Sequence, residues 1–556
     1  MSALTPVQVV GEFRSPGGVG ERLHSYIQKK AKTNASWLAD WWLQDDFLDY
    51  REPLVVFSST SCTLGTMAFR SKDDQLKHQV PVDMLHGRPL DMSQYFRVFS
   101  TCRAPGIPSD ELMLYGSGPD FPQHIVVIHN NRFFRIDAYH PDGSPLSPNQ
   151  FFTALSQVVK MSPEVGEPLG LLTTENRDVW VRCHRKLQED RESWNSIDQI
   201  QKSIFILCLD RPVPPMDTDQ TTHALMCCYT GASSAYNGGN RWYDKCIQLL
   251  VSEDGILGMT VEHSPAEGYP NTIIINAIQE DLESYEKYDW APLDPPSSPT
   301  ELKFNISPEI KEAIAAAGRN LDKYISIVEN TDVASHRFTK FSKNFLRSLD
   351  ISPDSFVQMA LQLSYYKLHG LTSMYEVATG RKFLHGRMEI VRGTTEDSIY
   401  MCEVFTDPTS SSLERLSALR AAVLGHKLAV IEATNGEGIE CLIQSYKKAS
   451  EELEMPLPLL FEDPGFLAAD DFRVLSSQVP VKKDGMGVYC PRGKSGYGVH
   501  YLLYPDYINI AVCSYRDFPE TDSKGYLDAI LDTMEELVDL ARSTKRVLRQ
   551  TSQGFS

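Results

Sequence analysis

Two stretches of the chain, residues 124–140 and 247–263, each read as a pair of short strands joined by a tight turn. The first, HIVVIHNNRFFRIDAYH, has apolar runs on both sides of an Asn-Asn pair, and the second, IQLLVSEDGILGMTVEH, has them on both sides of Ser-Glu-Asp-Gly. Asn, Asp and Gly tolerate the left-handed backbone that tight hairpin turns require. Elsewhere apolar residues recur at helical spacing, so strand and helix patterns alternate and predict a mixed α/β fold.

The length of the chain and one proline-rich segment predict how it divides. At 556 residues it exceeds the size at which one hydrophobic core stops growing, so at least two domains are expected. The segment APLDPPSSPT, residues 291–300, has four prolines and is predicted to be a linker. Ser307 and Pro308 then predict the start of a helix. That helix and a second one near the C-terminus have core-facing apolar stripes, formed by Ile310, Ile314, Ala317, Leu321, Ile325 and Val328, and by Leu527, Ile530, Leu531, Met534, Leu537 and Val538.

Composition argues against several classes of function. The formal charge is −19 and the isoelectric point is about 5.2, a balance that repels nucleic acid and anionic membranes. No run of 18 apolar residues occurs, so no membrane-spanning helix is expected. The eleven scattered cysteines, with no CxxC and no HExxH motif, indicate reduced thiols and no metal site. The N-terminus lacks a signal-peptide pattern and the C-terminus, QGFS, is not a peroxisomal tripeptide, so we expect a cytoplasmic protein.

The stretch VEHSPAEG holds the strongest candidate for catalysis. His263 follows a predicted strand, with Glu262 before it and Glu267 four residues after it. Histidine has the side-chain pKa nearest neutrality and is the usual general base, but a loop histidine is often only a hydrogen-bonded structural residue. Taken alone, the segment leaves both interpretations open and assigns no role to Glu262.

Longer motifs along the chain carry a family resemblance. In order, they are GGVGERLHSYIQKKA (17–31), WLADWWL (37–43), SIFILCLDRPVP (203–214), GGNRWYDK (238–245), LSSQVP (475–480) and YGVHYLLYPDYINIAVCSY (497–515). With them the chain resembles the carnitine/choline acyltransferase family over nearly its whole length. The resemblance implies two similar chloramphenicol-acetyltransferase-like α/β domains with the active-site tunnel at their interface. We expect residues 1–100 and 309–556 to form the domain that contacts pantetheine and the acceptor, and 101–308 to form the domain that carries His263.

The resemblance also implies catalytic roles for four residues. His263 matches the general base that removes the proton of the acceptor hydroxyl as its oxygen attacks the thioester. Glu267 matches a glutamate that pairs with an arginine, here Arg387, and so holds the histidine loop. Ser477 matches a hydroxyl that donates to the tetrahedral oxyanion.

Four cations are clustered in an otherwise acidic chain. Arg337, Lys340, Lys343 and Arg347 are spaced by 3, 3 and 4 residues, which would put them on one face of a helix. Without the resemblance, a solvated helix face is the favoured interpretation of the cluster. With it, Lys343 and Arg347 match the pair that holds the 3′-phosphate of coenzyme A, and Asp354 matches a further cofactor contact.

The predicted acceptor pocket departs from the family pattern. The resemblance aligns Tyr375, Met388, Cys441 and Tyr489 with this pocket. The carnitine enzymes bind the carboxylate of carnitine with a tyrosine, a threonine and an arginine, and here Met388 and Cys441 replace the last two. Losing a bidentate guanidinium typically costs a bound carboxylate several kcal/mol. The pocket therefore predicts an uncharged acceptor such as a polyol rather than carnitine, while choline, which has no carboxylate, is not excluded by this change.

The predicted acyl pocket departs from the short-chain members. Gly487 stands where those members have a bulky methionine, and medium- and long-chain members have glycine there. Each additional buried methylene contributes about 0.8 kcal/mol, so an open channel favours longer acyl groups. A simple turn glycine is the alternative interpretation.

These departures lead to one main functional hypothesis and two alternatives. The chain begins inside the family pattern, which suggests a domain of a longer polypeptide, most like the C-terminal carnitine-acyltransferase-like domain of a fungal highly reducing polyketide synthase. We expect it to move a medium or long polyketide-like acyl group from an acyl carrier protein or coenzyme A to a hydroxyl acceptor, releasing an ester. No permanently bound cofactor is expected, and the isolated domain is predicted to be monomeric. The alternatives are a free-standing coenzyme A-dependent carnitine or choline O-acyltransferase, and an inactive thioester-binding module.

Overall fold

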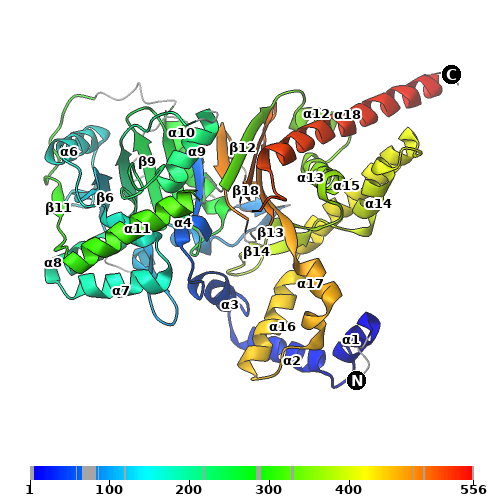
Figure 1. Cartoon of the computed structure of the whole chain (residues 1–556), viewed down its shortest axis with the longest axis horizontal. Helices are drawn as coiled ribbons and strands as arrows, with labels where there is room; N and C mark the ends of the chain where they lie inside the picture. The colour runs from blue at the N-terminus through cyan, green and yellow to red at the C-terminus, as the bar shows by residue number, and fades with distance from the viewer. Residues whose placement is uncertain are drawn as a thin grey trace. The chain divides into compact units, whose positions relative to one another are not determined.

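A computed structural model describes residues 5–57, 59–64, 83–85, 87–117, 121–216, 220–282, 290–326, 331–479, 481–491, 495–516 and 518–553. The chain forms two compact units (Figure 1). Unit 1 consists of residues 1–42, 332–478 and 491–556, and unit 2 of residues 43–331 and 479–490. Each unit contains one large sheet, and the mixed α/β class is confirmed.

Unit 2 is built on an eight-stranded sheet in the order β11-β7-β6-β8-β9-β10-β1-β16. Its strands are β1 (Ser59–Leu64), β6 (His124–His129), β7 (Arg132–Asp137), β8 (Ile206–Asp210), β9 (Ile247–Ser252), β10 (Leu257–Glu262), β11 (Thr300–Leu302) and β16 (Gly485–Val488). Two small ladders pair β2 (Met84–Leu85) with β3 (Arg88–Pro89), and β4 (Thr101–Ala104) with β5 (Glu111–Leu114). The helices are α4 (Leu54–Phe57), α6 (Pro148–Met161), α7 (Arg177–Gln188), α8 (Arg191–Lys202), α9 (Gln220–Thr230), α10 (Gly268–Leu282) and α11 (Pro308–Ser326), with shorter turns at Gln44–Leu48, Ser93–Phe96, Tyr115–Ser117 and Leu169–Thr174.

Both predicted hairpins of unit 2 are confirmed, and their turns have the expected physical cause. Asn130 and Asn131 join β6 to β7 with φ of 52° and 60°. The left-handed backbone at two consecutive central residues matches the twist of a tight antiparallel pair. Gly255, with φ of 89°, closes the turn between β9 and β10. The predicted helix start is also confirmed, because Ile310 N donates to Ser307 Oγ at 3.2 Å at the beginning of α11.

Unit 1 is built on a six-stranded sheet in the order β12-β18-β17-β15-β13-β14. Its strands are β12 (Thr331–Phe338), β13 (Ser373–Thr379), β14 (Met388–Arg392), β15 (Phe472–Ser477), β17 (Tyr497–Leu503) and β18 (Ile508–Tyr515). The helices are α1 (Pro6–Phe13), α2 (Val19–Thr33), α3 (Ala39–Leu43), α12 (Lys343–Ser348), α13 (Pro353–His369), α14 (Glu396–Thr406), α15 (Ser412–Thr434), α16 (Glu440–Glu452), α17 (Pro464–Asp470) and α18 (Ser523–Gln553), with a short turn at Leu459–Glu462. Helix α2 lies against α16 (Figure 1).

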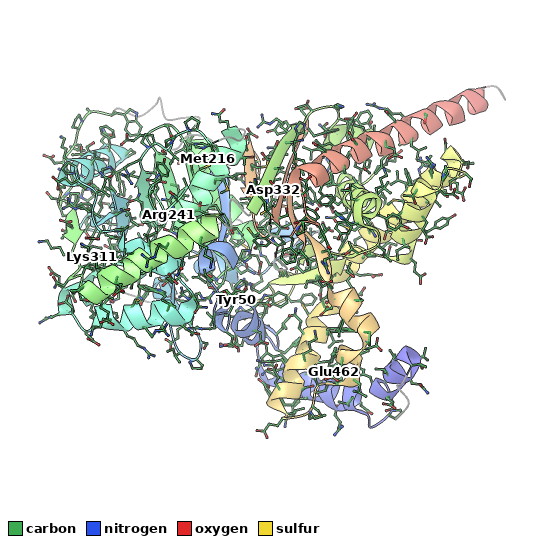
Figure 2. All side chains as sticks on the ribbon, in the orientation of Figure 1. Tyr50, Met216, Arg241, Lys311, Asp332 and Glu462 are labelled. Carbon is green, nitrogen blue, oxygen red and sulfur yellow. The ribbon has the colours of Figure 1, made fainter. Side chains whose placement is uncertain are left out.

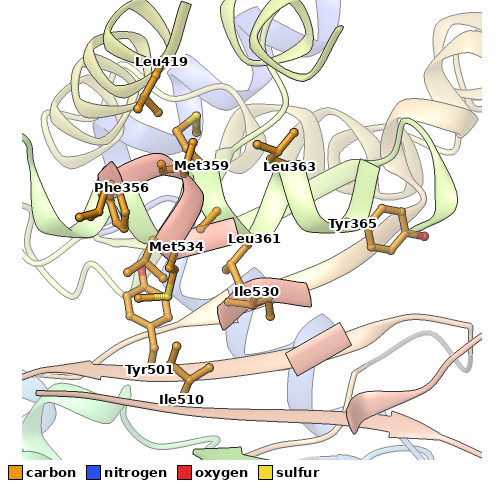
Figure 3. Close-up of a cluster of buried hydrophobic side chains, with 14 of the residues drawn as sticks. Phe356, Met359, Leu361, Leu363, Tyr365, Leu419, Tyr501, Ile510, Ile530 and Met534 are labelled. Carbon is orange, nitrogen blue, oxygen red and sulfur yellow. The ribbon is translucent and has the colours of Figure 1, made fainter. Parts of the chain in front are cut away.

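The core of unit 1 lies between the sheet and helices α13, α14, α15 and α18 (Figure 3). Met359, Leu363, Leu419 and Met534 are fully or almost fully buried in this cluster. The apolar stripe predicted near the C-terminus faces the same core from α18, with Leu531 only partly buried. Four residues of the predicted α11 stripe, Ile310, Ile314, Ala317 and Leu321, are buried in a separate core in unit 2. The other two, Ile325 and Val328, lie outside the side chains that the structure describes. Figure 2 shows the described side chains of both units on the ribbon.

The observed units differ from the predicted domain boundaries of 1–100 with 309–556 and 101–308. Residues 43–100 and 309–331 belong to unit 2, as does the short segment 479–490. The boundaries differ because segments distant in the sequence join the unit 2 sheet and its helices. Strands β1 and β16 extend the eight-stranded sheet, and α11 packs against α7. Residues 291–299 have no regular structure, as the prolines predict. In the described part of the chain, no helix is both long and apolar enough to cross a membrane.

Candidate active site

His263 lies at the point where strand β10 leaves the sheet of unit 2. The strand ends at Glu262, and the five residues 263–267 connect it to α10. The imidazole stacks on the Phe47 ring, with ring centroids 5.9 Å apart and planes inclined by 11°. His263 Nδ1 faces Glu267 Oε2 at 3.7 Å. The stacking holds the imidazole in place. The His263 side chain is 23% exposed and so remains accessible, as a proton-transferring group must be.

Glu262, to which sequence reasoning assigned no role, anchors the histidine loop. Its side chain is buried and accepts hydrogen bonds from Ser264, from the backbone N at 3.2 Å and from Oγ at 2.5 Å. The guanidinium of Arg103 lies 3.5 Å from Glu262 Oε1. The two residues on either side of His263 are therefore tied to each other and to strand β4.

A chain of buried charges extends from Glu262 into unit 2. Arg103 Nε and Arg177 Nε both donate to Asp110 Oδ2 at 2.7 Å, and Arg177 Nη1 donates to Asp244 Oδ1 at 2.6 Å. Burial raises the pKa of the Asp110 carboxyl, but Arg177 and Arg103 outweigh it and leave the pKa below its usual value. Buried charges are tolerated only when paired and hydrogen-bonded, so this network resists local rearrangement around the histidine loop.

Glu267 is held from its backbone as well as facing the imidazole. Its N–H donates to the side-chain oxygen of Gln94 at 2.8 Å. A side chain at the following position, Gly268, would place its Cβ 2.9 Å from Val479 Cγ1, so the loop packs closely as it enters α10. Arg387, the predicted partner of Glu267, lies immediately before β14 in unit 1 and is 9% exposed. Because the two residues belong to different units, their pairing stays a prediction.

Ser477 lies at the end of strand β15 in unit 1, beside His500 of β17 in the parallel register. The preceding residue, Ser476, is fully buried and bonded to α13 through Gln358 Nε2 at 2.9 Å. Side chains alternate along a strand, so Ser477 faces the opposite side of the sheet from Ser476. A strand end on the face away from α13 is a suitable position for a hydroxyl that contacts a ligand.

Three of the four predicted acceptor-pocket residues lie together in unit 1. Tyr375 on β13 places its hydroxyl 3.9 Å from Met388 Sδ, and Cys441 Sγ lies 3.4 Å from the Met388 carbonyl oxygen. Cys441 N donates to Glu389 Oε1 at 3.1 Å, and burial raises the pKa of the Glu389 carboxyl. The fourth residue, Tyr489, follows β16 in unit 2.

The prediction that four cations share one helical face is wrong. Arg337 lies on strand β12, where its guanidinium is 4.8 Å from the Tyr507 ring, and α12 begins only at Lys343. Lys340 lies between these elements and pairs with Glu535 of α18. Lys343 and Arg347 alone share α12, four residues apart. Partial burial and then the nearby Arg347 lower the pKa of the Lys343 ammonium, which is consistent with two cations held close enough to serve one phosphate.

Asp354, the predicted additional cofactor contact, belongs to a buried polar cluster. Its carboxylate accepts from Tyr501 Oη at 2.7 Å and from the Gln478 side chain. Burial and the negative charge of Glu376 raise its pKa to about 6. Ligand atoms of Asp354, Glu376 and His426 lie within 4.8 Å of one another, but His426 Nε2 and Glu376 Oε2 already bond to each other at 2.7 Å. The cluster is better described as a hydrogen-bond network than as a metal site.

Gly487 occupies a strand and not a turn. It lies in β16 and pairs with Cys62 of β1, with the glycine itself buried. The alternative of a simple turn glycine is therefore wrong. A buried glycine within a strand forgoes side-chain packing and often marks a place where a ligand or another backbone approaches closely.

Comparisons with known proteins identify the class of enzyme and then its family. The family model described as "Choline/Carnitine o-acyltransferase" matches residues 5–532. Carnitine O-acetyltransferase of Columba livia is 36% identical over 563 residues, covering 97% of this chain and 89% of that protein. Carnitine O-acetyltransferase of Rattus norvegicus is 34% identical, covering 96% and 88%, and choline O-acetyltransferase of Sus scrofa is 31% identical, covering 96% and 87%. The protein is an O-acyltransferase, and the chain belongs to the choline/carnitine O-acyltransferase family. Its assignment to a polyketide synthase stays a prediction.

Proposed function

We propose that this chain transfers an acyl group from a coenzyme A thioester to the hydroxyl of a small alcohol, with His263 as the general base. The observation that carries the proposal is the accessible imidazole at the exit of β10, stacked on Phe47 and facing Glu267. The relatives named above are carnitine and choline acetyltransferases and support a coenzyme A-dependent reaction of this type.

In the proposed reaction, His263 Nε2, the ring nitrogen away from Glu267, removes the proton of the acceptor hydroxyl. The hydroxyl oxygen attacks the thioester carbonyl carbon and forms a tetrahedral intermediate. Ser477 Oγ donates a hydrogen bond to its oxyanion. The carbon–sulfur bond then breaks, and the imidazolium returns the proton to the leaving thiolate, which leaves an ester and a free thiol.

Coenzyme A is the proposed donor because Lys343 and Arg347, which the family resemblance aligns with the 3′-phosphate contacts, lie four residues apart on α12. Pantetheine carried by a protein has no 3′-phosphate for these cations to contact. Alanine at both positions is expected to raise the KM for an acyl-coenzyme A and to leave the KM for the corresponding acyl-dephospho-coenzyme A nearly unchanged. Lys340→Ala is the matched control, because Lys340 belongs to the same basic segment but pairs with α18. An equal change for both donors would contradict the proposal.

The proposed acceptor has no carboxylate. Met388 contacts both Tyr375 and Cys441. The family resemblance aligns Met388 and Cys441 with the groups that bind the carboxylate of carnitine, and neither can replace a guanidinium. Choline and neutral alcohols need no guanidinium, so they fit this set of residues better than carnitine does. A panel of carnitine, choline, glycerol and sugar alcohols, assayed by release of free thiol, tests this. Carnitine as the preferred acceptor would refute it.

A second candidate function is transfer of a polyketide-like acyl group from an acyl carrier protein to a polyol. The buried Gly487 favours it, because this position is expected to open a channel for a medium or long acyl chain. The same basic helix α12 would then meet an acidic carrier protein. Comparing octanoyl-coenzyme A with an octanoyl carrier protein at equal concentration separates the two candidates, since each predicts the higher kcat/KM for its own donor.

A further inference from the structure

The two chain neighbours of Ser477 both form hydrogen bonds within one polar network. Strand β15 alternates, so Val474 and Ser476 face the helices, while Ser477 faces the other side. Ser476 Oγ donates to the Tyr375 carbonyl oxygen at 3.1 Å and accepts from Gln358 Nε2. The side chain of Gln478, the next residue after Ser477, donates to Asp354.

Tyr501 connects the hydrogen bonds of Ser476 with those of Gln478. Its hydroxyl accepts from Gln358 Nε2 at 2.9 Å and lies 2.7 Å from Asp354 Oδ1, to which it donates. Glu376 Oε1 lies 3.2 Å from the same hydroxyl, and His426 bonds to the other oxygen of Glu376. The network thus connects Ser476, Gln358, Tyr501, Asp354 and Gln478 in sequence.

Ser476, Gln358 and Tyr501 lie inside an apolar core, where unpaired polar groups are costly, whereas Gln478 at the end of the network is exposed. Tyr501 is fully buried among apolar side chains such as Phe356, Ile510 and Met534 (Figure 3). In such surroundings each polar group costs free energy unless it is hydrogen-bonded, and a fully satisfied network has one strongly preferred geometry. Replacing buried charged groups by well-packed apolar side chains is often neutral or stabilising, so stability alone does not explain such a network.

We propose that Tyr501, Gln358 and Asp354 are positioning residues that set the Ser477 hydroxyl for the oxyanion through its neighbours Ser476 and Gln478. The inference deepens the proposed function and rests on Ser477 as the oxyanion donor. A hydroxyl contributes to catalysis only when it points at the developing oxyanion within hydrogen-bond distance. Hydrogen bonds that fix both chain neighbours of Ser477 also fix the backbone at the end of β15. Packing of the small Ser477 side chain alone would restrict that backbone less. The bond from Ser476 to the Tyr375 carbonyl ties the predicted acceptor pocket to the same network.

The test is a double-mutant cycle between the network and Ser477. Tyr501→Phe removes one hydroxyl and keeps the ring. Ser476→Ala is a second, smaller change in case Tyr501→Phe fails to fold. Tyr526→Phe is the matched control, because Tyr526 is fully buried in the same core and its hydroxyl donates to the Leu361 carbonyl at 2.9 Å, outside the network. Each is combined with Ser477→Ala, and kcat is measured at saturating acyl-coenzyme A and alcohol.

Ser477→Ala is expected to lower kcat by about 10²–10³-fold, as loss of an oxyanion donor does elsewhere. Tyr501→Phe and Ser476→Ala should each lower kcat by about tenfold when Ser477 is present and by less than about twofold when it is alanine, because the effect acts through Ser477. The KM for acyl-coenzyme A should change by less than about twofold, and Tyr526→Phe should leave kcat within the same range.

Two outcomes overturn the inference, and they can be told apart. If Tyr501→Phe lowers kcat equally with and without the Ser477 hydroxyl, the network does not act through Ser477, while the proposed acyl transfer stands. If Ser477→Ala leaves kcat unchanged, Ser477 is not the oxyanion donor, and that part of the proposed function fails together with the positioning role.

Discussion

Glu262 is the residue whose replacement most directly tests how the histidine loop is held. Its buried carboxylate accepts two hydrogen bonds from Ser264 and faces the guanidinium of Arg103, which is itself fully buried. Glu262→Ala leaves the Ser264 hydroxyl without this acceptor and leaves Arg103 with Asp110 as its carboxylate partner. Breaking a buried pair by removing one partner typically costs about 3–5 kcal/mol. That is a large fraction of the roughly 5–15 kcal/mol by which a domain is stable.

Glu262→Gln is the informative control, because the amide oxygen keeps an acceptor for Ser264 while the charge is lost. Hydrogen bonds to charged groups contribute about 1.5–3 kcal/mol, so this variant should lose about half as much stability as Glu262→Ala. Unfolding of both variants in urea, followed by circular dichroism, gives the difference in free energy of unfolding. Turnover at a temperature where both remain folded should fall more for alanine than for glutamine. A loss below about 1 kcal/mol for Glu262→Ala would refute the anchoring role.

Three further predictions follow from other sites. Gly487→Met should close the part of the channel that holds about four methylenes, each worth about 0.8 kcal/mol. The kcat/KM for octanoyl relative to acetyl donors should therefore fall by about 10²-fold, and an unchanged ratio would show that Gly487 is not part of the acyl site. Alanine at both Lys343 and Arg347 should raise the KM for acyl-coenzyme A by about 10–100-fold, with Lys340→Ala within about twofold, and equal effects of all three would indicate a general charge effect. The raised pKa of Asp354, about 6, means that the folded chain retains a proton that the unfolded chain releases near pH 4, so this group lowers stability as pH rises from about 4 to above 6. The difference in unfolding free energy between the protein and Asp354→Asn should therefore change over that window by on the order of 2–3 kcal/mol, and a constant difference would contradict the raised pKa.

The predictions that succeeded depend on residues close together in the sequence. The Asn130–Asn131 hairpin and the helix after Ser307 were predictable because turn and cap chemistry acts over three or four residues. The exit of β10 at His263 followed from the same strand pattern. The family motifs extended this local information to residues far apart, since the match from 5 to 532 confirms the family.

The predictions that failed depend on pairing that the local pattern does not contain. The basic segment has helical spacing, yet Arg337 lies in β12, because that strand joins the sheet beside β18 and buries Ala334 and Phe338. The pairing of β12 with β18 outweighed the helical spacing of the four cations, which is a weak signal because exposed cations are tolerated in helices, strands and loops. Glu262 could not be assigned for a similar reason, because its partner Arg103 lies far away in the sequence. The one local sign in the sequence was its place at the end of a mainly apolar predicted strand, because a carboxylate that becomes buried there needs a partner.

The central claim is that His263 moves the proton during acyl transfer, and one variant tests it most directly. His263→Ala should lower turnover of acyl-coenzyme A with the preferred alcohol by at least about 10²–10⁴-fold, the range that general-base catalysis supplies. The same variant should bind acyl-coenzyme A with unchanged affinity by calorimetry and unfold at nearly the same temperature, because the side chain is partly exposed and Glu262 still anchors its neighbours. Turnover that stays within a fewfold of the unmodified protein, with binding intact, would contradict the account.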